Sequence, residues 1–133
     1  MSGVLVVDAS AAMRMVGGEG RAESAVEGAD KVIAPAVFAA EVANALWKYV
    51  HAGQLGVVNV VSRLRHALAI PDELEPLTQA GAAAALEAAI YADHPVYDMI
   101  YICLAEREGA ALVTADRRLA ELAEARAIEV VHA

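Results

Sequence analysis

The apolar positions along the chain change period several times, and each change marks an expected element. Val4–Val7 is an apolar run without alternation, which is typical of a parallel strand covered on both faces. Residues 31–34 and Ala111–Thr114 show a similar pattern, and residues 74–77 and 127–131 are two further strand candidates. The expected strands are 4–7, 31–34, 74–77, 111–114 and 127–131, with 74–77 as a short edge strand.

Helical spacing fills the intervals between these runs. A long helix is expected to open at Pro35, because apolar residues recur at intervals of three and four until Gly53. Another opens at Pro95 and ends before Gly109. It is apolar around most of its circumference, so we expect it to be buried. The other expected helices are 10–16, 20–27, 55–69, an alanine-rich helix over 78–92 suited to packing closely on the sheet, and one that begins after Asp116.

Strands that alternate with helices favour an α/β fold, a three-layer α/β/α domain with a central parallel sheet and right-handed crossovers. At 133 residues, the chain is expected to form one domain and to bury about two thirds of its unfolded surface. Ligands of such sheets bind at the carboxyl ends of the strands. The functional residues are therefore expected along that edge.

Four acidic residues fall at or beside that edge. Asp8 directly follows the first strand, and Asp116 lies two residues beyond Thr114. Asp98 belongs to the first turn of the buried helix, and Glu41 shares a helix face with apolar neighbours three and four residues away. Because strand ends and the helix starts beside them meet along one edge, the four carboxylates are expected to converge.

Converging acids predict a bound cation, because carboxylates a few Å apart repel one another unless some are protonated or a cation lies among them. Hard oxygen ligands select Mg²⁺ or Mn²⁺, and no paired Cys or His has zinc spacing. Such ions activate water and stabilise charge on a phosphate during in-line displacement. The acids thus favour hydrolysis of a phosphodiester.

Each acid also has an ordinary structural explanation. Asp8 and Asp116 could cap the helices that follow them, and Asp98 suits the positive end of a helix dipole. Glu41 could lie at a partly exposed edge of its helix. These alternatives explain the acids singly, whereas a metal site explains all four together.

The net charge of −8 argues superficially against a nucleic-acid partner. If four of the 18 acids form a metal site, 14 remain against 10 bases, so the rest of the chain is only four charges negative. Basic patches could still hold a polyanion. Arg117 and Arg118 adjoin the proposed site, and Arg14 is similar, so each is either a phosphate contact or a solvated helix charge.

Other features of the sequence argue against a membrane protein, a thiol enzyme and a zinc site. No uncharged apolar stretch reaches the roughly 20 residues of a membrane span, and residues 1–8 lack the basic start of a signal peptide, so we expect a cytoplasmic protein. The single cysteine, Cys103, is expected to be a buried thiol rather than a nucleophile. The four histidines show no ligand spacing, and Trp47 is expected in the core or at an interface.

Four segments resemble the motifs of PIN-domain ribonucleases, and most closely the VapC-type toxins of type II toxin–antitoxin systems. They are VVDAS at 6–10, EVANAL at 41–46, PVYDMIYICLA at 95–105 and VTADRRL at 113–119. Their order and spacing extend the resemblance over essentially the whole chain. It implies a single PIN-like domain over residues 1–133.

The resemblance also implies a site and an activity. Its implied metal-binding and catalytic acids are Asp8, Glu41, Asp98 and Asp116. Thr114 and Ser10 match hydroxyl positions near the metal, and Asn44 matches a polar position after the glutamate. The implied activity is Mg²⁺- or Mn²⁺-dependent endonucleolytic cleavage of RNA by a homodimer that a cognate antitoxin inhibits. The segment RRLAEL after Asp116 lacks a further acid at the position where some relatives carry one, which leaves open whether one or two ions bind.

A rival hypothesis is a non-catalytic PIN-fold module that binds RNA or protein without turnover. Two other classes are disfavoured. A phosphotransferase with an aspartyl intermediate would need another acid at its usual spacing after Asp8, where Ala9 and Ser10 stand. A receiver-type domain would need an acid pair after the first strand and a lysine near the last, and neither is present.

Overall fold

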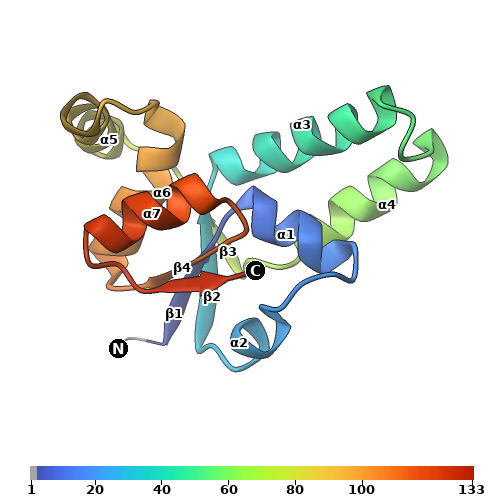
Figure 1. The fold of residues 1–133 in the computed structure, drawn as a ribbon, viewed down its shortest axis with the longest axis horizontal. Coiled ribbons are helices and arrows are strands. Elements are labelled where there is room, and N and C mark those ends of the chain that lie inside the picture. Colours follow the sequence, from blue (N-terminus) through green and yellow to red (C-terminus); the bar gives the residue numbers. More distant parts are fainter. Residues whose placement is uncertain (1–2) are drawn as a thin grey trace.

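In the computed structural model, which describes residues 3–133, five parallel strands form one sheet in the order β3-β2-β1-β4-β5 (Figure 1). The strands are β1 (Val4–Val7), β2 (Lys31–Pro35), β3 (Glu73–Glu75), β4 (Ala111–Thr114) and β5 (Val130–His132). Residues 1 and 2, which the expected domain includes, lie outside the described residues. The expected parallel sheet is confirmed.

Seven helices cover the two faces of this sheet in the described part of the chain (Figure 1). They are α1 (Ala9–Val16), α2 (Glu23–Glu27), α3 (Val37–His51), α4 (Val57–Leu68), α5 (Gln79–Ala92), α6 (Val96–Glu108) and α7 (Arg117–Ala125). Figure 1 shows α3 and α4 as an antiparallel pair that extends away from the sheet on the side of α1. The architecture is the expected three-layer α/β/α fold.

The two faces of the sheet bury separate hydrophobic cores. Leu5 and Val7 of β1 point into the core shared with α1, α3 and α4, whereas Val6 points into the core shared with α5, α6 and α7. This alternation follows from the period of two in a strand, and burial on both sides explains why β1 is apolar throughout. Helix α6 is the most deeply buried, as expected, with these residues in the core: Met99, Ile100, Tyr101, Ile102, Leu104 and Ala105.

The ends of several elements differ from the expected ones for local reasons. Pro35 ends β2 instead of opening a helix, because the N–H of Ala36 donates to the carbonyl of Glu75 at 2.8 Å and extends the pairing past the proline. The last strand begins at Val130 instead of residue 127. Ala127 has a left-handed φ of 60°, and the Ile128 N–H donates to Ala123 at the end of α7.

Other expected boundaries are shorter or displaced. The helix expected over 20–27 is confined to α2, and the edge strand expected over 74–77 is β3. Helix α5 packs mainly against α6 rather than directly on the sheet. The small side chains of α5 still allow close packing, because its residues Ala85, Ala88 and Ala89 are buried in the core.

Two residues are less buried than a core position requires. Trp47 is 58% exposed, which excludes the core and leaves the interface alternative as a prediction, and its ring stacks on that of His51 with centroids 5.1 Å apart. Cys103 is only half-buried, and burial raises the pKa of its thiol, which keeps it protonated and unreactive. Among residues 3–133, no helix is both long enough and apolar enough to cross a membrane.

Candidate active site

Asp8 lies at the carboxyl end of β1 and is held by two hydroxyl groups. Asp8 is only 5% exposed. Thr114 Oγ1 donates to Asp8 Oδ2 at 2.6 Å, and Ser10 Oγ lies 2.8 Å from Oδ1 and 2.9 Å from Oδ2. The N–H of Ala11 donates to Oδ1 at 2.8 Å, so Asp8 also caps α1. These contacts fix the carboxylate in one orientation.

The backbone after β4 in turn fixes both hydroxyls. The N–H of Asp116 donates to Thr114 Oγ1, and the N–H of Ala115 donates to Ser10 Oγ, each at 3.0 Å. Because each hydroxyl oxygen accepts from an amide, its own proton is directed toward Asp8. The ends of β1 and β4, which are neighbours in the sheet, are therefore joined by one hydrogen-bond network.

Burial raises the pKa of Asp8 from 3.8 to about 6. This value is the net result: the charge of Asp116 contributes to the rise, whereas the bonds from Thr114, Ala11 and Ser10 lower the pKa. The direction shows that desolvation outweighs the three hydrogen bonds. A buried carboxylate of this kind is stabilised by any cation that reaches it.

Glu41 contacts the buried helix α6. The hydroxyl of Tyr101 donates to Glu41 Oε1 at 2.6 Å, and Tyr101 is only 2% exposed. Partial burial raises the pKa of Glu41, the bond from Tyr101 lowers it, and the charge of Asp98 raises it. Burial and the same carboxylate raise the pKa of Tyr101, with smaller contributions from Asp8 and Asp98. The phenol is therefore a neutral donor near three of the four acids.

Asp98 has a partner on the segment that precedes α6. Nε2 of His94 lies 2.7 Å from Asp98 Oδ2, and His94 is 8% exposed. The position of His94 is set by its backbone N–H, which donates to the carbonyl of Ala89 at the end of α5 at 3.0 Å. An acid that enters the core needs a partner, and this imidazole supplies one for Asp98.

Two of the acids feel the charges of the other two: Asp116 raises the pKa of Asp8, and Asp98 raises the pKa of Glu41. Within residues 3–133, no three His, Cys, Asp or Glu side chains form a group ready to hold a metal ion. The chemistry of the donors, four carboxylates with hard oxygens, nevertheless fits Mg²⁺ or Mn²⁺. Their assignment as ligands stays a prediction.

The capping explanations are also correct as far as they go. Asp8 caps α1, and Asp116, an exposed residue, caps α7 through the N–H groups of Arg118 and Leu119 at 2.9 Å and 3.2 Å. Asp98 lies in the first turn of α6, and Glu41 is half-buried. Local structure thus gives each acid a structural reason for its position, and these reasons leave the metal hypothesis open.

Tyr101 and His94 were not among the expected site residues. Tyr101 is three positions after Asp98, and His94 is four positions before it, so both have the spacing of a shared helix face. The sequence signal was a polar group at helical spacing from an acid in an otherwise apolar segment. Both residues now join the site as partners of its acids.

A groove borders this site between α1, α3 and α4. It has a volume of about 770 Å³. Glu41, Ser10 and Ala115 form the wall it shares with the acids, and Asn44 lies exposed beside them. The remainder of its lining comes from the three helices and from the loops that follow α1 and α3.

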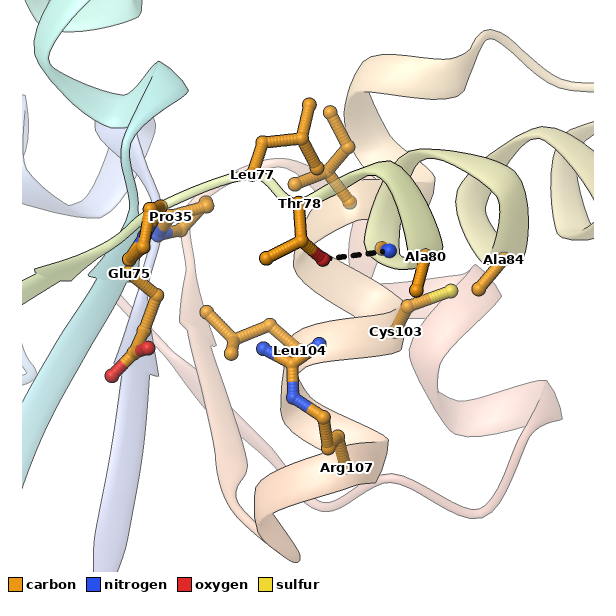
Figure 2. Close-up of a pocket in the computed structure, with 12 residues that line it drawn as sticks. Pro35, Glu75, Leu77, Thr78, Ala80, Ala84, Cys103, Leu104 and Arg107 are labelled. Carbon is orange, nitrogen blue, oxygen red and sulfur yellow. Dashed lines mark hydrogen bonds between the residues drawn. The ribbon is translucent and has the colours of Figure 1, made fainter.

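A second hollow, of about 460 Å³, lies between α5, α6 and segment 75–78. Figure 2 shows Cys103, Leu104 and Arg107 of α6 facing Leu77 and Thr78 across it. None of the four candidate acids lines it, and Thr78 is occupied as the cap of α5. This hollow is therefore separate from the candidate site.

Two known proteins resemble this chain in sequence and in fold. The chain is 37% identical over 126 residues to "Ribonuclease VapC3" of Pyrobaculum aerophilum, covering 88% of this chain and 92% of that protein. The crystal structure of PAE2754 from Pyrobaculum aerophilum superposes with a TM-score of 0.75 at 27% identity, covering 96% of this chain and 83% of that one.

A family profile described as the PIN domain matches residues 5–125, which include all four acids. The assignment of residues 1–133 to one domain stays a prediction. With a profile over most of its length and a relative this similar, the chain belongs to the PIN-domain family.

Proposed function

We propose that the chain is a VapC-type endoribonuclease that hydrolyses phosphodiester bonds of RNA with Mg²⁺ or Mn²⁺. The observation that supports this proposal is that a PIN domain carries Asp8 and Asp116 just after the neighbouring strands β1 and β4, and Glu41 and Asp98 on α3 and α6. The likeness to a protein named a ribonuclease over 92% of its length supports the same activity.

The residues that would hold the ion are Asp8, Glu41, Asp98 and Asp116. The chemistry supplied by an ion there would be activation of water and stabilisation of charge on the phosphate. Each protein group has a definite task around it. Ser10 and Thr114 orient Asp8, Tyr101 orients Glu41, and His94 orients Asp98. Burial keeps bulk water away from Asp8.

We further propose the partners that VapC-type proteins imply, a cognate antitoxin and a second copy of the chain, with the cytoplasm as the place of action. The homodimer is supported by large apolar side chains exposed on α5 and at the start of α6. They are Leu86, Ile90, Tyr91 and Tyr97, which are 52%, 72%, 91% and 62% exposed. Burial of such a face in a dimer would remove it from water.

The activity is tested with Asp98→Asn and a matched control, Asp93→Asn. Asp93 is an exposed residue that ends α5 with φ 51°, a conformation that Asn also adopts, so its substitution should change little. With labelled single-stranded RNA and Mg²⁺ or Mn²⁺, Asp98→Asn should lower cleavage at least about 100-fold. Asp93→Asn should cleave like the wild type.

Circular dichroism of both variants checks the fold. Equal cleavage by wild type and Asp98→Asn would reject the proposed site. Binding of RNA with no cleavage by any variant, with either ion, would favour the rival hypothesis of a non-catalytic module.

A further inference from the structure

We infer that the groove between α1, α3 and α4 binds the phosphodiester backbone of a single RNA strand beside the cleavage site. This inference rests on the proposed function, because it assigns the surface that would hold the substrate. The occupant is identified by the charges, polar groups and position of the groove.

Three cations from three helices line the groove: Arg14 of α1, Lys48 of α3 and Arg63 of α4. The chain has only 10 Lys and Arg residues against 18 acids, so three in one groove is a marked local excess. Apart from Glu41, which belongs to the candidate metal site, the only acid in the lining is Glu19. The groove is thus locally positive on a chain of net charge −8.

These cations are not committed to other side chains in the described structure. The two Lys or Arg ion pairs with acids found there join Lys31 to Glu73 and Arg126 to Glu106, and both lie elsewhere. Nε of Arg14 is buried and has no hydrogen-bond partner within residues 3–133. A buried guanidinium donor without a partner is costly. The Arg14 side chain also lines the groove, where its guanidinium could bind a phosphate.

The remaining groups of the groove suit a nucleic acid better than a simple anion. Tyr49 is 44% exposed at its lining, where its ring offers a face for a base to stack on. Asn44 adds an amide that can donate and accept. Ser10 and Glu41 also line the groove, so a strand bound in it would contact a candidate acid and a neighbour of Asp8.

Arg63 and Arg65 provide a matched test on one helix. Both are exposed residues of α4, but only Arg63 lines the groove. Arg63→Gln and Arg65→Gln each remove one positive charge, so they change the net charge equally. Because both side chains are at the surface, both variants should fold normally, as urea unfolding would check. Lys48→Gln, also at an exposed position, is a second groove variant.

The assay is fluorescence anisotropy of a labelled single-stranded RNA at several salt concentrations, with EDTA present so that nothing is cleaved. Loss of one phosphate contact should reduce the slope of log K against log salt by about 0.7, which corresponds to about fivefold weaker binding near 0.1 M salt. We expect this change for Arg63→Gln and Lys48→Gln, and less than about twofold for Arg65→Gln.

Equal effects of Arg63→Gln and Arg65→Gln would overturn the inference, as would absence of RNA binding by the wild type. It would also be overturned if Arg63→Gln weakened binding of a poly-glutamate peptide but not of RNA, because the groove would then be a protein site. If the wild type binds RNA through the groove but fails to cleave it when Mg²⁺ or Mn²⁺ is restored, the inference stands and the proposed activity fails.

Discussion

Asp8→Asn should change how the stability of the metal-free protein depends on pH. Burial raises the pKa of Asp8 from 3.8 to about 6 in the folded chain. Between these two values, the carboxyl is protonated when the chain is folded and ionised when it is unfolded. The folded state therefore binds more protons in this range, so the stabilising contribution is complete below pH 3.8 and is lost as the pH rises through about 6.

The size of this effect follows from the same values. At about 1.4 kcal/mol for each pH unit, the rise from 3.8 to about 6 corresponds to a loss of about 3 kcal/mol across the whole range. About 0.8 kcal/mol of this loss falls between roughly pH 5.5 and 7.5. This interval lies above the isoelectric point of 4.9. Asn cannot ionise, so its contribution should be the same throughout.

Urea unfolding of wild type and Asp8→Asn at several pH values, with EDTA present, measures the effect. The difference in unfolding free energy between the two proteins should move by about 0.8 kcal/mol in favour of Asp8→Asn as the pH rises over that interval. Groups common to both proteins cancel in this comparison. Parallel curves for the two proteins would show that Asp8 has the same pKa in the folded and unfolded chains, and the argument from burial would be wrong.

Four further predictions concern the metal, its supporting residues and the dimer. Tyr101→Phe should weaken Mn²⁺ binding about 10-fold to 100-fold in calorimetry, because it removes only the hydroxyl that holds Glu41. Tyr97→Phe, at an exposed position of the same helix, is the control and should bind Mn²⁺ like the wild type. His94→Gln should weaken Mn²⁺ binding on the same scale through Asp98, with the exposed His66→Gln as its control. EDTA should stop RNA cleavage and added Mg²⁺ or Mn²⁺ should restore it; cleavage that persists after dialysis against EDTA would contradict a metal-dependent reaction. Ile90→Glu should shift the protein toward monomer in sedimentation, and an unchanged sedimentation profile would place the interface elsewhere.

The sheet was predictable from sequence because its central strands are buried on both faces. Val4–Val7 and Ala111–Thr114 were expected at the bounds that the structure shows, since an uninterrupted apolar run is the signature of such a strand. Edge strands carry a weaker pattern. β3 reads Glu-Leu-Glu and is mostly exposed, so its bounds depend on pairing with β2 rather than on its own residues.

Which residues support the site could be predicted only in part. Strand ends in a parallel sheet suffice to place Asp8 and Asp116 at the same edge, and the structure adds that their strands β1 and β4 are neighbours. Thr114 was expected from the resemblance alone, and its bond to Asp8 spans 106 positions. The contact between Tyr101 and Glu41 spans 60 positions and depends on how α3 lies against α6. No local sequence pattern encodes how these two helices lie against each other, because their arrangement is set by side-chain packing of the whole layer.

The structural and the catalytic explanations of the acids need not compete, because two of the acids can serve both. A helix cap needs an oxygen that accepts from backbone N–H groups, which Asp8 and Asp116 supply to α1 and α7. A metal needs the charge of the same carboxylates. Asn keeps the accepting oxygen and loses the charge, whereas Ala loses both and costs about 1 kcal/mol at a cap. Substitution by Asn therefore separates the two roles, and a loss of cleavage without a loss of fold in Asp116→Asn would assign the charge of Asp116 to function.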